Sequence, residues 1–472
     1  MLSLTVLTLF DVVFVSGSAI LTAQAIYVRR HAHNSSRVAL AGLARSAALW
    51  TWAGLVFGIL CALGGELLAA LIAPGFRPEA RAIFARCCVI GCLLPAATAL
   101  MTFASALNRI NGREVLFTVN PLIINSVSWL AIAVAAFLGA TSLGIIQAFL
   151  VSVVLSTLAM FAWQLRCMEP TQRHWLRAHF ARALLPRRLL LRARLHRREL
   201  RAVSPIFGAL LIQQVVTLIS YAFVTRAGAG VLLLFGLAER LVNVIFAVFI
   251  MTFITVLEPR WARAAVTPGR SREISDDVAI ICAALIPLTA TLMFAGDSLA
   301  ALLFGHGAVN ARDVGELGDI TRIYALALPG LSLGLVLTRL LVIRNHGGHI
   351  FLVNVGVTVL HLALCSAGFA LAGARGVGAA LAVTLGVQAA AFALQLARGG
   401  DRAARAERIG IGARLVLLAL LVIAVGWAAD QIELGFLAHL VTVSCATLLT
   451  TFAGGRLLGL KLLGSVRRLA RL

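Results

Sequence analysis

Two adjacent charged side chains lie inside a long apolar stretch, residues 231–263. The stretch exceeds the ~20 apolar residues that a helix needs to cross a bilayer. Glu239 and Arg240 lie roughly 13 Å from its start at ~1.5 Å per residue. An ionised group at that depth costs about 2.5–3.5 kcal/mol to insert, so it normally faces a wet cavity or a partner. The pair is the chain's strongest pointer to a binding site, unless the two side chains satisfy each other or a neighbouring helix.

A guanidinium in a low-dielectric cavity suits phosphate or diphosphate, because its planar fork bonds two oxygens at once. We expect Arg240 to play this part. Asp11 lies in the middle third of another apolar stretch, residues 2–28, where a short side chain cannot reach the membrane surface. Asp11 is therefore expected to line the same cavity as Arg240.

Further polar candidates are distributed along the apolar stretches. Side chains that could hydrogen-bond a sugar are Gln24, Asn125, Gln213, Gln214, Asn243 and Asn354. The commoner use of such residues is to join one membrane helix to another. Arg339 lies about one turn from the end of its stretch, where it can bind a ligand or extend its charge to the membrane surface.

The composition identifies the class of protein that holds these residues. The chain of 472 residues is 61% hydrophobic and 13% charged, which excludes an ordinary soluble domain. Apolar runs of about 18 or more residues recur from end to end. Such runs are too long for barrel strands, and lipid admits only helices or closed barrels. The fold class is therefore an all-α polytopic membrane protein.

The strong positive charge of the chain follows the membrane topology. The net charge is +22, and all 41 basic residues except Lys461 are arginines. On one side of the expected spans the connections hold 32 basic residues, and on the other side they hold seven. The basic side is expected to be cytoplasmic, with the N-terminus outside and the C-terminus inside. These loops would attract anionic lipid headgroups, and a nucleic acid partner is not expected.

Hydropathy predicts thirteen membrane spans. They cover residues 2–28, 44–73, 82–108, 115–138, 143–165, 203–225, 231–257, 277–304, 320–343, 349–372, 376–397, 412–429 and 436–458.

The sequence also repeats itself once. Three short matches recur in the same order, namely 65–72 with 296–303, 81–85 with 322–325, and 109–112 with 344–347. An even number of spans separates the matching helices, so the two copies point the same way across the membrane. The first copy is one helix short, because the counterpart of 203–225 would lie before residue 2.

The repeat divides the chain into four expected parts. The N-lobe has five helices, a basic cytoplasmic linker follows, the C-lobe has six helices, and two additional helices precede a basic tail. Their bounds are 1–165, 166–202, 203–397 and 398–472. The two lobes would surround a central cavity.

The sequence gives little indication of a metal-binding site or of a catalytic site. The eight cysteines lie mostly in or beside apolar runs and form no Cys-x-x-Cys pair. His346 and His349 make a two-ligand motif, which is common by chance without a third ligand. General-acid or metal-assisted chemistry needs placed carboxylates, and the loops carry no carboxylate cluster. We therefore expect neither a metal, nor a cofactor, nor an enzyme.

Several short motifs resemble one family of transporters. They are Ala73-Pro74-Gly75-Phe76, Leu107-Asn108 through Gly112-Arg113, Pro121 with Asn125, and Ala238-Glu239-Arg240-Leu241 leading to Leu257-Glu258-Pro259-Arg260. In order and spacing they are similar to the MurJ-like lipid II flippases, or mouse virulence factor family. That family belongs to the multidrug/oligosaccharidyl-lipid/polysaccharide exporter superfamily. The resemblance runs from about residue 15 to the end.

This resemblance implies a flippase of the bacterial cytoplasmic (inner) membrane. The protein would carry a polyprenyl-diphosphate-linked saccharide, such as lipid II, to the outer leaflet by alternating access. Arg240 matches the family's cavity arginine, and the two C-terminal helices would form a groove for the lipid tail. The family carries further arginines on its first two helices, whereas residues 1–28 here contain none.

Other functions remain open at this point. One alternative is a cation-coupled drug or polysaccharide exporter of the same superfamily. Another is a non-transporting, flippase-like protein that acts with cell-envelope biosynthesis proteins. Transport could be coupled to the membrane potential or to a monovalent cation.

Overall fold

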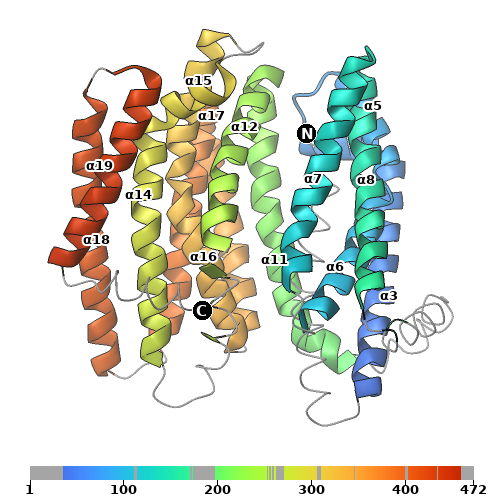
Figure 1. Ribbon diagram of the computed structural model, residues 1–472, viewed down its shortest axis with the longest axis horizontal. Coiled ribbons are helices and arrows are strands. Elements are labelled where there is room, and N and C mark those ends of the chain that lie inside the picture. Colours follow the sequence, from blue (N-terminus) through green and yellow to red (C-terminus); the bar gives the residue numbers. More distant parts are fainter. Residues whose placement is uncertain are drawn as a thin grey trace. The chain divides into compact units, whose positions relative to one another are not determined.

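The computed structural model is helical throughout its described part and shows no strand there. Described residues are 36–110, 114–168, 170, 173, 197–251, 253–254, 257, 260–261, 271–305, 310–344, 346–398, 402–432 and 434–458. The chain divides into two compact units, residues 1–214 and 215–472. Within each unit most of the helices run side by side (Figure 1).

The first unit contains six described helices and most of a seventh. They are α3 (Ser36–Leu63), α4 (Gly65–Ile72), α5 (Pro78–Ile90), α6 (Leu94–Ile110), α7 (Glu114–Phe137), α8 (Ser142–Cys167) and α11 (Arg197–Val224). Helix α11 continues past Gln214, so its last turns belong to the second unit.

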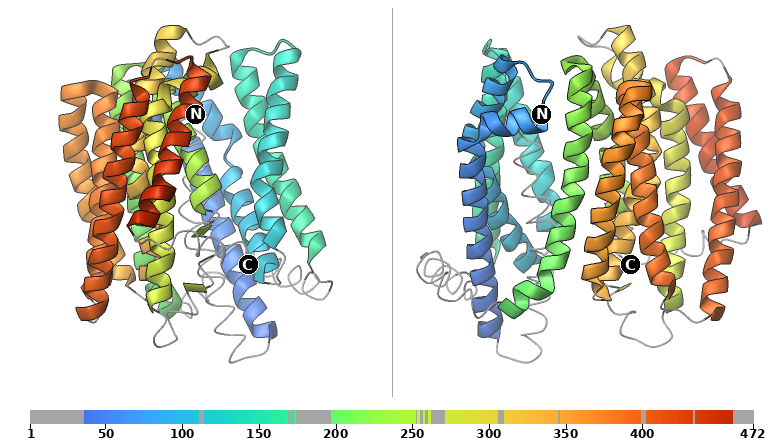
Figure 2. Two further views of the ribbon diagram at one scale, coloured as in Figure 1. Left: turned by 60° about the vertical axis from the view of Figure 1, so that its left-hand side comes forward. Right: turned by 180° about the vertical axis from the view of Figure 1, so that it is seen from behind.

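The second unit contains the remaining described helices, shown from two further sides in Figure 2. They are α12 (Ala229–Ile245), the π-helical segment η3 (Phe246–Met251), α14 (Ser271–Phe304), α15 (Ala311–Ala325), α16 (Ala327–Ile343), α17 (Gly347–Arg398), α18 (Arg402–Asp430) and α19 (Phe436–Leu457). A short 3-10 turn, Thr225–Ala227, precedes α12.

The expected spans fall on these helices wherever residues are described. Every span from 44–73 to 436–458 overlaps a helix or a bent pair of helices. The first span, 2–28, lies outside the described residues. By length and composition, eight described helices could cross a membrane, or up to ten if each bent pair is one span. The all-helical membrane fold is thus confirmed, and the number thirteen stays a prediction.

The structure places the same backbone bend in both copies of the sequence repeat. Gly64 separates α3 from α4 with φ −97° and ψ 14°, and the helices meet at 82°. Ala295 interrupts α14 with φ −109° and ψ 18°. Each bend directly precedes a matched glycine, Gly65 or Gly296, that lies against the next helix. A Cβ there would come within 2.8 Å of Ala85 or 3.2 Å of the Arg322 side chain. This likeness supports the repeat.

Helix α17 is a hairpin of two antiparallel arms. Its chain turns at Gly373, where φ is +58°, a value that favours glycine. The arms meet so closely that a Cβ on Gly376 would lie 1.8 Å from the Gly368 carbonyl oxygen. A hydrogen bond also joins the two arms: the side-chain amide of Gln388 donates to the side-chain oxygen of Asn354 (2.7 Å). The turn separates the two spans expected at 349–372 and 376–397.

Buried polar side chains join helices within each unit. In the first unit, Ser105 donates to Gln164 (2.9 Å) and receives a hydrogen bond from Asn120 (3.0 Å), which ties α6 to α7 and α8. In the second unit, the fully buried ring of His361 bonds Ser220 of α11 and Thr384 of α17, each at 2.9 Å. Such bonds satisfy polar groups that lipid cannot hydrate.

Helix α15 positions residues of the candidate site, and its ends explain why it forms. The Asn310 side chain caps it by accepting a hydrogen bond from the Asp313 backbone N–H (2.8 Å). Asp313 lies in the first turn and Arg322 in the last, so each charge interacts favourably with the helix dipole at its own end of the helix.

Candidate functional site

Glu239 lies among side chains from three helices of the second unit. The hydroxyl of Tyr221, on α11, donates a hydrogen bond to the Glu239 carboxylate. Tyr324, on α15, and Asn243, one turn further along α12, also hydrogen-bond this carboxylate. The bonds replace the water that an ionised carboxylate would lose inside a membrane. The Glu239 side chain is therefore held by its neighbours.

An aromatic cluster fixes the two tyrosines. Phe235 lies one turn before Glu239 and packs edge-on against both rings, with centroids 6.1 Å from Tyr221 and 5.6 Å from Tyr324. Phe235 is 1% exposed, and each tyrosine is 6% exposed. Edge-to-face rings at these separations restrict each other's orientation. The two hydroxyls are thus directed at Glu239 by packing.

Arg240 is the neighbour of Glu239 in the chain but has a different environment. Successive side chains on a helix point in different directions, so they do not face one another. Glu239 is partly buried, whereas Arg240 is exposed. The carboxylate and the guanidinium nevertheless interact electrostatically. Glu239 thus contacts neighbouring helices, and the side chain of Arg240 lies on the exposed surface of α12.

The other residues expected at the site have separate positions. Asp11 and Gln24 lie outside the described residues. In the first unit, Asn125 is exposed on α7 and Gln213 is partly exposed on α11. In the second unit, Arg339 is partly exposed on α16. Of the expected residues, the structure brings together Glu239 and Asn243, with Arg240 beside them.

Tyr221 and Tyr324 were not expected from the sequence. The chain contains only three tyrosines; Tyr221 lies in the apolar part of α11, and Tyr324 lies in the last turn of α15, just before the apolar helix α16. A rare hydroxyl in such a segment normally needs a polar partner, which is the signal that could have identified them. Their distance from Glu239 along the chain concealed the contact.

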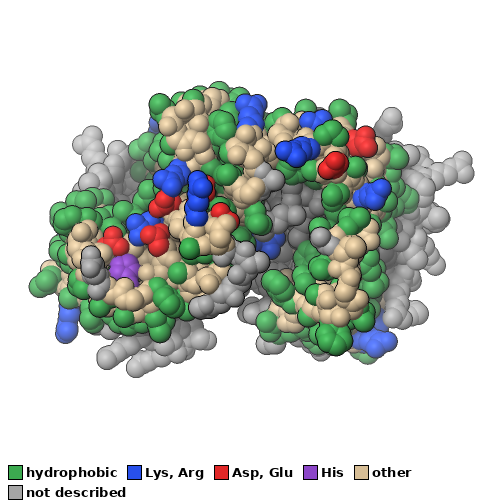
Figure 3. All heavy atoms as spheres, turned by 90° about the horizontal axis from the view of Figure 1, so that it is seen from above, with side chains coloured by type: hydrophobic (Ala, Val, Ile, Leu, Met, Phe, Trp, Pro, Cys, Tyr) green, Lys and Arg blue, Asp and Glu red, His purple; other side chains and the backbone are tan. Residues whose placement is uncertain are grey.

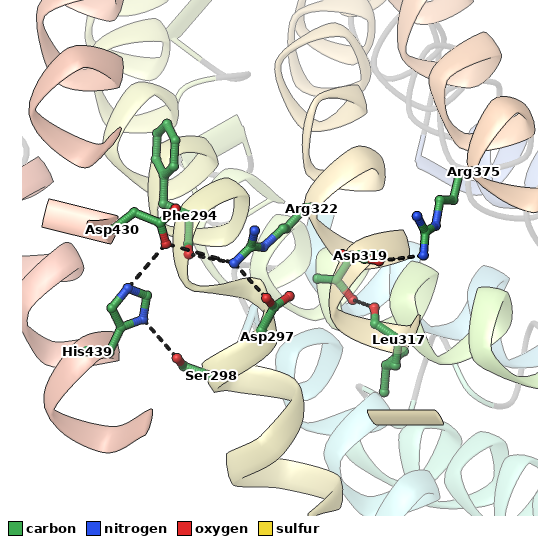
Figure 4. A network of polar contacts seen from close by, with 10 residues as sticks. Phe294, Asp297, Ser298, Leu317, Asp319, Arg322, Arg375, Asp430 and His439 are labelled. Carbon is green, nitrogen blue, oxygen red and sulfur yellow. Dashed lines mark hydrogen bonds and ion pairs between the residues drawn. The ribbon is translucent and has the colours of Figure 1, made fainter. Parts of the chain in front are cut away.

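A network of charged side chains joins α18 and α19 to the rest of the second unit. Arg322 of α15 pairs with Asp297 of α14 (2.6 Å) and Asp430 of α18 (3.8 Å). His439 of α19 bonds Asp430 (3.2 Å) and Ser298 (2.9 Å). Figure 4 shows Arg322 between the two carboxylates. The end of the molecule seen in Figure 3 carries acidic and basic side chains close together among hydrophobic ones.

Replacing Asp430 with asparagine should loosen this end of α18 and α19. The side chain of Asp430 is 21% exposed and forms ion pairs with Arg322 and His439. We therefore expect the free energy of unfolding to fall by about 0.5–1.5 kcal/mol. Hydrogen exchange should rise at the start of α19, and the thermal midpoint should fall. As a control, Asp319 pairs with Arg375 (2.5 Å) but is 39% exposed. If Asp319→Asn has an equal effect, the network does not anchor these helices.

A second group of polar contacts links Arg260 and Trp261 to α14. The indole of Trp261 donates to Asp277 of α14 (3.1 Å), and Arg260 pairs with the same carboxylate (3.5 Å). Trp261 is fully buried. Arg260 therefore has a structural role. Among the described residues, no group of three or more His, Cys, Asp or Glu side chains could hold a metal ion.

Comparison with known proteins identifies a family that matches most of the chain. The profile of the family described as "MurJ: Lipid II flippase MurJ" matches residues 12–448. No curated relative matches the chain. The match covers both units and includes Glu239 and Arg240.

Solved structures show the same fold at low sequence identity. "Lipid II flippase MurJ, inward closed conformation" is similar with a TM-score of 0.66 and 17% identity, covering 96% of each chain. A variant of the Vibrio cholerae MATE transporter VcmN has a TM-score of 0.58 and 14% identity, covering 84% of this chain and 87% of that one. The bent form of VcmN has a TM-score of 0.54 and 15% identity, covering 83% and 84%. The family match, which spans most of the sequence, shows that this chain belongs to the MurJ lipid II flippase family.

Proposed function

We propose that this membrane protein translocates a polyprenyl-diphosphate-linked saccharide from the inner to the outer leaflet by alternating access. In this proposal the substrate is lipid II or a close relative, and Arg240 binds its diphosphate. Membership of the lipid II flippase family supports the substrate class. The resemblance in fold to a MATE transporter supports a transport cycle of the same kind.

The exposed guanidinium of Arg240 is the observation that carries the residue-level proposal. The carboxylate of Glu239 accepts a hydrogen bond from Tyr221 where α12 packs against its neighbours, whereas the side chain of Arg240 is exposed. An exposed charge within a membrane helix is costly unless water or an anion meets it. A diphosphate offers paired oxygens that match the guanidinium fork. Asp11, Gln24 and Asn243 remain further candidates for contact with the head group.

The arrangement of the chain in the membrane is also part of the proposal. Basic connections face the cytoplasm and contact anionic lipids, with the N-terminus outside and the C-terminus inside. The lobes 1–165 and 203–397 alternate their access around the substrate, and the linker 166–202 joins them. The segment 398–472 contributes two helices and a basic tail.

A leaflet-accessibility assay tests the function. The purified chain is reconstituted into vesicles with lipid II, and the fraction of substrate in the outer leaflet is followed with a membrane-impermeant modifying reagent. We expect accelerated exchange for the polyprenyl-diphosphate saccharide and none for a phospholipid of similar size. Export of an amphipathic drug without lipid II exchange would favour the alternative exporter. Exchange of neither would favour the non-transporting role.

A further inference from the structure

Four buried polar side chains meet where α6, α7 and α8 pack together in the first unit. They are Ser105 and Asn108 of α6, Asn120 of α7 and Gln164 of α8, and each is at most 3% exposed. Besides the bonds that Ser105 makes to Asn120 and Gln164, the side-chain amide of Asn108 donates to the backbone carbonyl of Gln164 (3.2 Å). Ser105 and Asn108 lie one turn apart on the same face of α6. The three side-chain amides therefore gather beside that face.

Each of these amides has one polar atom whose hydrogen-bonding capacity is unused. Within the described part of the chain, no partner reaches the Oδ1 atoms of Asn108 and Asn120 or the Nε2 atom of Gln164. Turning an amide about its last bond exchanges its donor and its acceptor, so at least one of its atoms stays unpaired in either orientation. Unpaired polar atoms are costly when buried, and lipid cannot hydrate them. The cluster therefore needs a further hydrogen-bonding partner.

A water molecule has the complementary set of hydrogen bonds. Two acceptor oxygens and one donor nitrogen match the two O–H groups and a lone pair of water. Buried water typically makes about three hydrogen bonds to polar groups that would otherwise be unpaired. A metal cation is not favoured, because the four side chains are all neutral and a charge inside lipid needs a charged partner.

We propose that Asn108, Asn120 and Gln164 bind one water molecule, which completes the hydrogen bonds that join α6, α7 and α8. The water donates to the two Oδ1 atoms and accepts a hydrogen bond from the Nε2 group of Gln164. The site gives Asn108, in the Leu107-Asn108 motif, a role in helix packing rather than in substrate contact. The inference does not depend on the proposed function, because these side chains belong to the first unit and Arg240 belongs to the second.

The direct test is an electron cryo-microscopy map of the full-length wild-type protein in lipid nanodiscs, at a resolution that shows ordered water. We expect one peak of density within hydrogen-bonding distance, about 2.7–3.2 Å, of the two Oδ1 atoms and of the Gln164 Nε2 atom. If the map shows ordered water elsewhere but none at this position, the proposal is overturned. This measurement needs no variant, so it stands even if substitutions in the cluster prevent folding.

A pair of substitutions tests whether the water couples the helices. Asn108 and Asn120 bond different residues of the cluster, and in the proposal the water bridges them. Asn108→Ala and Asn120→Ala should each lower the thermal midpoint by roughly 2–4 °C, and the double variant should lose clearly less than the sum. As a control, Ser128→Ala removes a buried hydroxyl of α7 that bonds the Ile124 carbonyl of its own helix (2.7 Å). Its effect should add to that of Asn108→Ala. Additive losses for Asn108→Ala and Asn120→Ala would overturn the bridge.

Discussion

Replacing Arg240 with alanine should abolish growth of a bacterial strain that depends on this protein as its lipid II flippase. Charge-assisted hydrogen bonds contribute about 1.5–3 kcal/mol each, and a guanidinium makes two with a diphosphate. The lost pair should lower substrate affinity by roughly two orders of magnitude or more. The side chain of Arg240 is exposed, so the variant should still accumulate as folded membrane protein.

Two companion variants separate charge from geometry. Arg240→Lys keeps the charge but loses the planar fork, so partial growth is expected. Arg375→Ala removes an exposed arginine whose partner is Asp319, and it should support normal growth. Complementation and membrane abundance are measured together. Normal growth of Arg240→Ala at wild-type abundance would contradict the assignment of the diphosphate to this residue.

Replacing Gly376 with alanine should prevent the second unit from folding normally. The added Cβ would lie 1.8 Å from the Gly368 carbonyl oxygen, an impossible contact with backbone rather than with a movable side chain. The arms of α17 would have to separate. This would break the Asn354–Gln388 and His361–Thr384 bonds. Overpacking ordinarily costs about 1–3 kcal/mol, and the loss of buried hydrogen bonds adds to this cost.

The matched control for this prediction is another glycine of the same helix. A Cβ on Gly356 would meet nothing within 4 Å, so Gly356→Ala should be neutral or stabilising by roughly 0.5–1 kcal/mol through helix propensity. Fluorescence-detected size-exclusion chromatography after a heating series compares the two variants. A monodisperse Gly376→Ala protein with an unchanged thermal midpoint would show that the α17 arms do not need this close approach.

The sequence predicts the helical framework well for a physical reason. A helix that crosses lipid must satisfy its backbone internally and expose apolar side chains, so its hydropathy marks its position. The matched segments 65–72 and 296–303 also indicated where the two units would resemble each other. The bends at Gly64 and Ala295 lie just before these segments, and the division into two repeat-related lobes stays a prediction.

Contacts between distant side chains are harder to predict. Glu239 could be recognised as a candidate site residue from its expected depth in the membrane, but its bonds to Tyr221 and Tyr324 depend on how three helices pack. The same is true of Arg322, which pairs with Asp297 and Asp430 from different helices. Hydropathy gives the position of each residue along its own helix and does not give the rotation of that helix against its neighbours.

The central claim is that Arg240 recognises the diphosphate of a polyprenyl-linked substrate. The most direct measurement compares the affinities of farnesyl diphosphate and farnesyl monophosphate for wild-type protein and for Arg240→Ala. Two adjacent phosphoryl groups can meet both arms of the guanidinium, so wild type should prefer the diphosphate by about tenfold or more. Arg240→Ala should bind both compounds weakly and without preference. An unchanged preference for the diphosphate in Arg240→Ala would contradict the claim.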